Sequence, residues 1–145
     1  MRIALAADHA GFDLKEHLEA FLRQQGHEVS DFGTDDRQST DYPDWAARVA
    51  AAVASGDADR GLLVCGTGTG MAMAANRRRG VRAVASGDLV TVQLARRHND
   101  ANVLALGARL VAPPLAEELL DAFLATPFEG GRHAGRVTKI DGTPG

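Results

Sequence analysis

The sequence predicts an α/β fold, a three-layer, doubly wound, five-stranded parallel sheet of the Rossmann-like type. Short apolar segments alternate with helical segments whose apolar residues recur every three to four positions. The apolar segments alternate only weakly with polar residues, which is typical of parallel strands covered by helices on both faces. The length of 145 residues suits one domain, 1–145, which buries about 70% of its unfolded surface on folding.

The first half of the chain is predicted to hold three strands and two helices. Residues 2–7 are a short apolar strand, and the helix after it ends at Gly26. Residues 27–32 are the second strand, and the polar, turn-rich segment 33–41 that follows is a loop able to cover a site. The second helix starts near Asp41, has a proline in its first turn and reaches Gly56. The third strand is 61–65.

The second half continues the alternation. A helix over 71–78 ends near Gly80, and 81–85 is the fourth strand. Ser86-Gly87-Asp88 opens the next helix with a capping side chain, and that helix ends at 98–100. Residues 102–106 are the fifth strand, and two prolines start a last helix at 113. The tail 128–145 is Gly-rich and basic in its first half, irregular or partly helical, and outside the core.

Composition excludes several classes of partner. Sixteen Lys and Arg against nineteen Asp and Glu give no support to a nucleic-acid partner. No apolar stretch approaches the roughly 18 residues of a membrane helix. The single cysteine cannot form an intramolecular disulfide, and residues 1–10 meet Asp8 and His9 too early for a signal-peptide core, so we expect a cytoplasmic protein.

The segment 61–76, GLLVCGTGTGMAMAAN, is the centre of the predicted site. Three glycines after a buried strand allow backbone N–H groups to point at an anion at a helix start, and the same surroundings favour a thiolate on Cys65. The segment is not a P-loop, since no Gly-Lys-Ser/Thr follows, and it fails the G-x-G-x-x-G fingerprint at Met71 and Met73. Asp88, about twenty residues on, keeps a nucleotide-binding alternative open.

Further polar residues are candidates for chemistry. Asp8-His9 follows the first strand and could carry protons or cap a helix, and His98 ends a helix, where the dipole favours its protonated form. Arg132 and Arg136 suit a phosphate clamp. The run 77–79 is three arginines on a solvent face or a subunit contact. No metal-ligand spacing occurs, so neither a metal nor a cofactor is predicted.

These motifs, taken in order, resemble a known family. They are Asp8-His9-Ala10-Gly11, Asp41-Tyr42-Pro43, Cys65-Gly66-Thr67-Gly68-x-Gly70, Ala74-Ala75-Asn76, Gly80-Val81-Arg82-Ala83, His98-Asn99-Asp100-x-Asn102-Val103-Leu104 and Glu129-Gly130-Gly131-Arg132-His133. The chain resembles the type B ribose 5-phosphate isomerases, a group that includes galactose 6-phosphate isomerase subunits, from residue 2 to about 137. The resemblance implies a homodimer, or a tetramer, with sites at the subunit interface and metal-free aldose–ketose isomerisation.

The resemblance also implies residue roles. Cys65 is the base that moves a proton between C1 and C2, and the backbone of Gly66, Thr67, Gly68, Thr69 and Gly70 stabilises the enediolate. His98 is the acid that helps open the sugar ring, with Asp8 and Thr67 near the ring oxygen and hydroxyls. Phosphate and sugar oxygens are bound by His9, Asn99, Arg109, Arg132 and Arg136, some from across the dimer, and Tyr42 flanks the sugar. Some relatives use a glutamate at the position of Met71 instead, so this chain is similar to the cysteine branch. Arg77 departs from the lysine common in relatives.

Three functions follow as hypotheses. The first is interconversion of ribose 5-phosphate and ribulose 5-phosphate, or of another tetrose, pentose or hexose phosphate. The second is a nucleotide-binding module of the flavodoxin-like or universal-stress-like kind. The third is a thiol hydrolase that uses Cys65 and His98.

Overall fold

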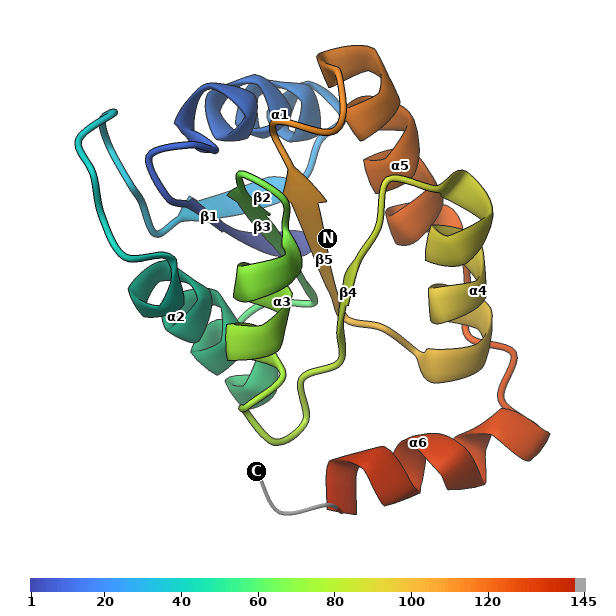
Figure 1. The fold of residues 1–145 in the computed structure, drawn as a ribbon. Coiled ribbons are helices and arrows are strands. Elements are labelled where there is room, and N and C mark those ends of the chain that lie inside the picture. The colour runs from blue at the N-terminus through green and yellow to red at the C-terminus, as the bar shows by residue number, and fades with distance from the viewer. Residues whose placement is uncertain (143–145) are drawn as a thin grey trace.

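A computed structural model describes residues 1–142 and shows a five-stranded parallel sheet with helices on both faces (Figure 1). The strands are β1 (Arg2–Ala7), β2 (Glu28–Asp31), β3 (Arg60–Cys65), β4 (Ala83–Ala85) and β5 (Val103–Gly107). The helices are α1 (Phe12–Gln24), α2 (Tyr42–Ser55), α3 (Thr69–Ala75), α4 (Leu89–Asn99), α5 (Pro113–Ala125) and α6 (Arg132–Gly142). The predicted fold class is confirmed.

The two faces of the sheet have different cores. Helices α1, α4 and α5 cover one face, where the strands present larger side chains such as Leu5, Leu62 and Leu104. Helices α2 and α3 cover the other face, where Ala4 and Ala105 keep the strand surface low and allow close approach. Successive strand residues point to opposite faces, so β1, β3 and β5 contribute buried residues to both cores.

The strand order β2-β1-β3-β5-β4 places a switch point between β1 and β3. From β1 the chain crosses to β2 on one side, and it later returns to β3 on the other side of β1. The connections that follow β1 and β3 therefore run in opposite directions. Gly11 lies in the first of these loops, and a Cβ there would be 2.3 Å from the carbonyl oxygen of Val64 in β3. The loop after β1 therefore packs directly against the end of the strand that carries Cys65.

Several predicted boundaries shift for local reasons. Helix α3 starts at Thr69, two residues before the predicted 71, because Gly68 at φ +80° turns the chain straight into it. Strand β4 starts at Ala83 rather than 81, because the N–H of Arg82 donates to Oδ1 of Asn102 instead of to a neighbouring strand. The predicted cap of α4 is confirmed, since Asp88 accepts the Thr91 N–H at 2.7 Å.

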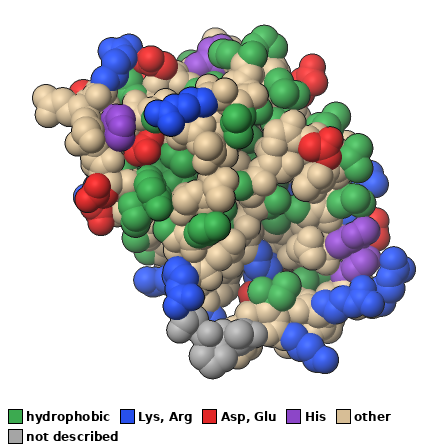
Figure 2. Space-filling model, in the orientation of Figure 1, with side chains coloured by type: hydrophobic (Ala, Val, Ile, Leu, Met, Phe, Trp, Pro, Cys, Tyr) green, Lys and Arg blue, Asp and Glu red, His purple; other side chains and the backbone are tan. Residues whose placement is uncertain are grey.

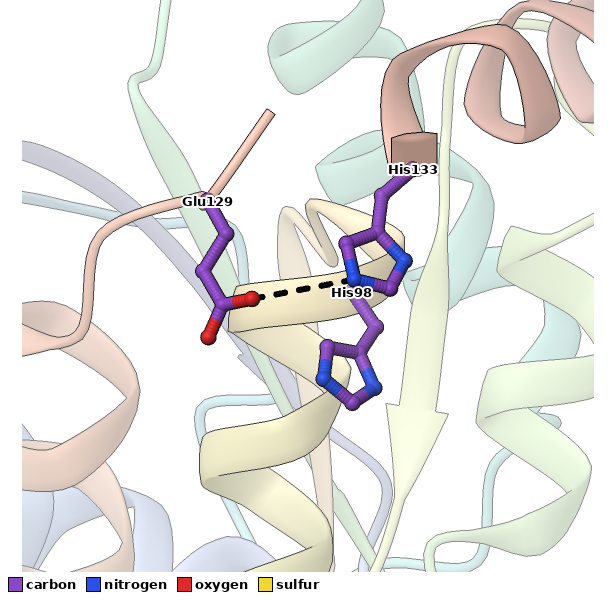
Figure 3. Close-up of side chains that lie close together, drawn as sticks. All are labelled: His98, Glu129 and His133. Carbon is purple, nitrogen blue, oxygen red and sulfur yellow. Dashed lines mark ion pairs between the residues drawn. The ribbon is translucent and has the colours of Figure 1, made fainter. Parts of the chain in front are cut away.

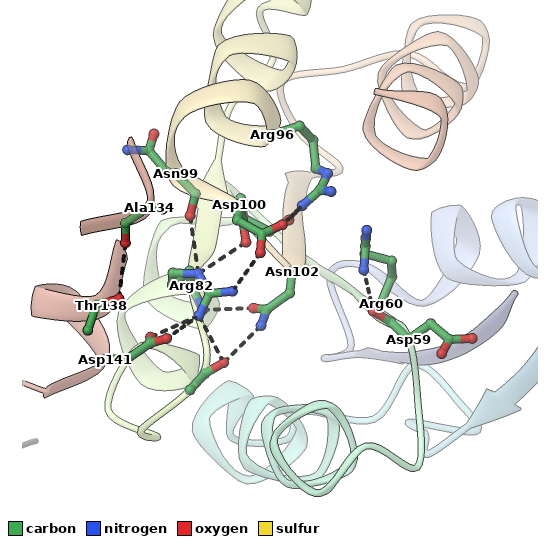
Figure 4. A network of polar contacts seen from close by, with 12 residues as sticks. Asp59, Arg60, Arg82, Arg96, Asn99, Asp100, Asn102, Ala134, Thr138 and Asp141 are labelled. Atoms are coloured by element: carbon green, nitrogen blue, oxygen red, sulfur yellow. Dashed lines mark hydrogen bonds and ion pairs between the residues drawn. The ribbon is translucent and has the colours of Figure 1, made fainter. Parts of the chain in front are cut away.

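The tail forms helix α6, which packs against the end of α4 and not on the sheet (Figure 1). A pocket of about 370 Å³ separates α6 from the body, and it is lined by the segment between α3 and β4, by α4 and by α6. Arg82 bridges this gap. Its guanidinium donates to Asp141 at 2.8 and 2.9 Å and to the backbone carbonyls of Asn99 and Asp100 (Figure 4). The last three residues of the predicted tail lie outside the described residues.

Within residues 1–142 the structure contains no helix that is both long and apolar enough to cross a membrane.

Candidate functional site

The predicted site residues fall into two groups at opposite edges of the sheet. The first, here the Cys65 cluster, lies where β1, β3 and β5 end. It consists of Asp8, His9, Tyr42, residues 65–70 and Arg109. The second, here the His98 cluster, lies where α4 ends and α6 begins. It consists of His98, Asn99, Arg132, His133 and Arg136.

Cys65 is the centre of the first cluster. Its side chain is 5% exposed at the end of β3, and the backbone N–H of Gly68 donates to its Sγ at 3.1 Å. Gly68 has φ +80°, a conformation that glycine adopts without strain. A Cβ at this position would also lie 3.0 Å from the carbonyl oxygen of Ala105. The sequence thus needs glycine at this position both to turn an N–H towards the sulfur and to fit against β5.

Two side chains, those of Tyr42 and Arg109, lie against the glycine loop 66–70. A Cβ on Gly70 would lie 2.7 Å from the ring of Tyr42, and a Cβ on Gly66 would lie 3.1 Å from the guanidinium of Arg109. Tyr42 is the first residue of α2, and Arg109 is held by its own backbone N–H, which donates to the carbonyl of Gly66 at 3.1 Å. The loop is therefore flanked by a phenol on one side and a cation on the other.

Asp8 and His9 occupy the loop after β1. Oδ1 of Asp8 accepts the N–H groups of Ala10 and Gly11 at 3.0 and 3.1 Å, so this carboxylate fixes the turn into α1. Nδ1 of His9 accepts the N–H of Thr40 at 3.2 Å. A neutral ring that accepts at Nδ1 carries its proton on Nε2, which is then free to donate to an anionic ligand. His9 also ties the predicted covering loop, 33–41, to the cluster.

The His98 cluster lies on the other edge. Helix α4 starts at the carboxyl edge after β4 and runs back over 11 residues, a rise of about 16 Å, so its last turn lies far from Cys65. His98 stacks on His133 with ring centroids 4.3 Å apart and planes 13° apart (Figure 3). Arg132 and Arg136 are exposed on α6, where Lys and Arg side chains gather beside histidines (Figure 2). One chain therefore keeps the two groups of predicted site residues apart.

Sequence reasoning did not assign every residue of this region. Glu129 and Arg82 were quoted only as parts of motifs, and His133 was considered only as an addition to the phosphate clamp of Arg132 and Arg136. Oε2 of Glu129 lies 3.7 Å from Nε2 of His133, and its backbone N–H donates to the carbonyl of Arg97. The i, i+4 spacing of Glu129 and His133 could have predicted from the sequence that the two side chains lie close together. The contact between His133 and His98 could not, because it depends on how α6 packs against α4.

Burial of His133 lowers the pKa of its ring, and the neighbouring His98 and Arg132 lower it further, while Glu129 opposes them. His133 is 5% exposed, and its Nε2 has no hydrogen-bond partner among the described residues. The protonated form of the second ring of the stack is thus disfavoured.

Comparison with known proteins identifies this arrangement. A family model described as Ribose/Galactose Isomerase matches residues 3–140. Ribose-5-phosphate isomerase B of Escherichia coli K12 is 49% identical over 139 residues, which are 96% of this chain and 93% of that protein. The solved ribose-5-phosphate isomerase B of Clostridium thermocellum superposes with a TM-score of 0.96 at 47% identity, over 98% of this chain and 96% of that one.

A third match carries a ligand. The ribose-5-phosphate isomerase B of Mycoplasma genitalium, solved with ribulose 5-phosphate bound, is 42% identical with a TM-score of 0.93, over 97% of this chain and 93% of that one. The fold and these matches define a sugar-phosphate aldose–ketose isomerase. The chain belongs to the Ribose/Galactose Isomerase family.

Proposed function

We propose that the chain interconverts ribose 5-phosphate and ribulose 5-phosphate, in sites that two copies of the chain build together. The observation that carries the proposal is the thiol of Cys65, buried beside a loop whose Gly68 N–H already donates to it. A carbon acid next to a carbonyl needs a positioned base and donors for the developing oxyanion, and both lie within four residues here.

In the proposed reaction the Cys65 thiolate removes the proton from C2 of the open-chain aldose. The electrons of the C–H bond form the enediolate, and the charge that develops on the oxygen is stabilised by backbone N–H groups of residues 66–70. The proton then returns to C1 while the proton of the C2 hydroxyl moves to the oxygen on C1, which leaves the carbonyl at C2 and gives the ketose. Asp8 and Thr67 act on the sugar hydroxyls, and Tyr42 flanks the sugar.

The second half of the site comes from the partner in this proposal. His98 opens the sugar ring as an acid, and Asn99, Arg132 and Arg136 bind oxygens of the substrate together with His9 and Arg109 across the interface. The separation of the two clusters by the length of α4 supports this, because the two clusters of one chain lie too far apart to hold one small sugar. In a two-fold dimer both clusters of each chain are used, so two complete sites result.

The surface beside the edge strand β4 supports such a dimer. Met73 on α3 and Val90 on α4 are 66% and 59% exposed, and Leu89 and Leu94 on α4 are exposed as well. The strand itself is only three residues long and leaves one edge unpaired by the rest of the sheet. We infer that a second copy covers this face, and that the enzyme works in the cytoplasm, where the Cys65 thiol stays reduced.

The function is tested by a coupled activity assay with four-, five- and six-carbon aldose phosphates. Ribose 5-phosphate is expected to give the highest kcat/KM, and a larger value for a tetrose or hexose phosphate would reassign the substrate within the family. Running the reaction in D₂O tests the mechanism. Solvent deuterium at C1 of ribulose 5-phosphate supports proton transfer through an enediolate, whereas complete retention of the substrate hydrogen argues for a direct hydride shift.

A further inference from the structure

The stack between His98 and His133 joins two elements that share few other contacts. His98 lies in the last turn of α4 and His133 in the first turn of α6, and their rings lie face to face at 4.3 Å (Figure 3). Two backbone hydrogen bonds fix the main chain at the start of α6, which carries the second ring. The N–H of His133 donates to the carbonyl of Gly130, and the N–H of Glu129 donates to the carbonyl of Arg97 in α4, both at 3.0 Å. The His133 ring is therefore a fixed surface, against which the half-buried His98 ring lies.

The charges around the stack favour a proton on one ring only. Two imidazolium rings at this separation repel each other, so protonation of either ring opposes protonation of the other. Four charged or titratable groups surround His133. They are His98 on α4, Arg132 and Arg136 on α6 itself, and Glu129 in the segment before α6. Three of these four groups disfavour a charge on His133, and burial adds to them. Glu129, at 3.7 Å, lies beyond hydrogen-bond distance and attracts a positive charge on the pair as a whole.

We propose that His133 is a positioning residue for His98: it remains neutral itself and holds the His98 ring in place by stacking on it. This inference rests on the proposed role of His98 as the ring-opening acid. A catalytic acid must present its proton in a fixed direction. Without the stack on His133, the His98 ring could rotate about its side-chain bonds.

The same side chains do not form a ready cation site. Their ligand atoms lie within 4.8 Å of one another. The lone pair of an imidazole nitrogen lies in the ring plane, however, and the two planes are nearly parallel, so the lone pairs do not converge on one point. Buffers with EDTA keep metal ions out of the measurements below.

The first test compares two substitutions of His133. Phenylalanine keeps a flat ring that can stack but cannot titrate, whereas alanine removes the stack. We expect His133→Phe to retain kcat within about twofold and His133→Ala to lose about 10-fold or more, mostly in kcat, because the acid is no longer held in place. If the phenylalanine variant loses as much activity as the alanine variant, or if neither loses activity, the positioning role is wrong.

The second test reads protonation directly by NMR of the histidine ring carbons and needs no activity. In the wild type, His133 is expected to titrate below the ordinary value of about 6.5. His98→Asn should raise the pKa of His133, because it removes an opposing charge, and Glu129→Gln should lower it further. A His133 ring that titrates at or above the ordinary value overturns the proposal. If the wild type converts no sugar phosphate, the proposed function fails. The titration then decides by itself whether His133 remains neutral in the stack.

Discussion

The backbone N–H of Gly68 donates a hydrogen bond to Sγ of Cys65 at 3.1 Å, across the sharp turn that joins β3 to α3. This hydrogen bond ties the sulfur of Cys65 to the backbone of the loop that follows it. The turn exists because Gly68 adopts a positive φ that other residues avoid. The backbone of residues 66–70 thus positions the side chain of Cys65, which precedes it.

Replacement of Cys65 by alanine should reduce kcat by about 100- to 10,000-fold, the usual contribution of a general base. Cys65→Ser provides the matched control, because it keeps a side chain of similar size at the same hydrogen bond but supplies a much weaker base. Both variants should lose activity together while their thermal unfolding stays close to that of the wild type. Wild-type turnover by the alanine variant would remove Cys65 from the mechanism.

Two inactive variants should restore each other if the site is shared. In a dimer of one Cys65→Ala chain and one His98→Asn chain, one site combines the intact Cys65 of one copy with the intact His98 of the other. Random mixing makes half of the dimers mixed, each with one complete site, so activity should recover to roughly a quarter of the wild-type value. The measurement is a rate assay after the two proteins are unfolded and refolded together.

The matched control mixes two lesions from the same cluster. Cys65→Ala with Asp8→Asn should recover no activity beyond that of the separate variants, because neither chain then supplies an intact Cys65 cluster. Equal recovery in both mixtures, or none in the first, contradicts a site built from the two clusters of different chains. Sedimentation of the mixed sample checks that dimers have formed.

The Cys65 cluster could be predicted from the sequence because its residues follow strand ends, and the ends of parallel strands share one edge. Asp8, Cys65 and Arg109 illustrate this, since each lies within three residues of a strand terminus. The position of the His98 cluster could not be predicted. Its geometry depends on α6, whose sequence RHAGRVTKIDG is mostly polar, buries His133 alone among its described residues, and packs through polar contacts such as Arg82 with Asp141. The resemblance predicted the roles of these residues, but only the fold showed that one chain separates them.

Gly70→Ala should weaken substrate binding through Tyr42. An added methyl group would lie 2.7 Å from the phenol ring, which is 41% exposed and can swing outward. Stability should therefore change little, while KM rises several-fold, on the order of 1 kcal/mol of lost binding. In a Tyr42→Ala background the same change should cost much less, because the two residues are in contact and their effects do not add.

Gly135→Ala is the control for this substitution. Gly135 lies on α6 with open space around it, so alanine should leave KM unchanged and stabilise the helix slightly. If Gly70→Ala raises KM equally with and without the Tyr42 ring, the contact between the two residues does not explain the effect.

The ion pair between Arg82 and Asp141 should hold α6 against the body of the protein. The guanidinium of Arg82 is mostly buried, bonds both oxygens of Asp141, and at the same time donates to carbonyls at the end of α4 (Figure 4). Asp141→Asn removes the negative charge of the carboxylate. Arg82→Lys keeps the positive charge but removes the guanidinium, whose several N–H groups reach Asp141 and the carbonyls at the same time. Both variants should show faster hydrogen exchange in α6 and the last turn of α4, with β1, β3 and β5 unchanged.

This loosening should reach the reaction through the arginines that we propose bind phosphate. Because Arg132 and Arg136 are carried by α6, KM should rise by about 3- to 10-fold with a smaller change in kcat, the pattern of a lost binding interaction. Thr138→Ala is the control, since the Thr138 hydroxyl bonds only Ala134 within α6 and does not reach the body. Unchanged exchange in α6 of the Asp141→Asn variant would mean that contacts nearer the start of the helix, including the stack of His133 on His98, are sufficient to hold it in place.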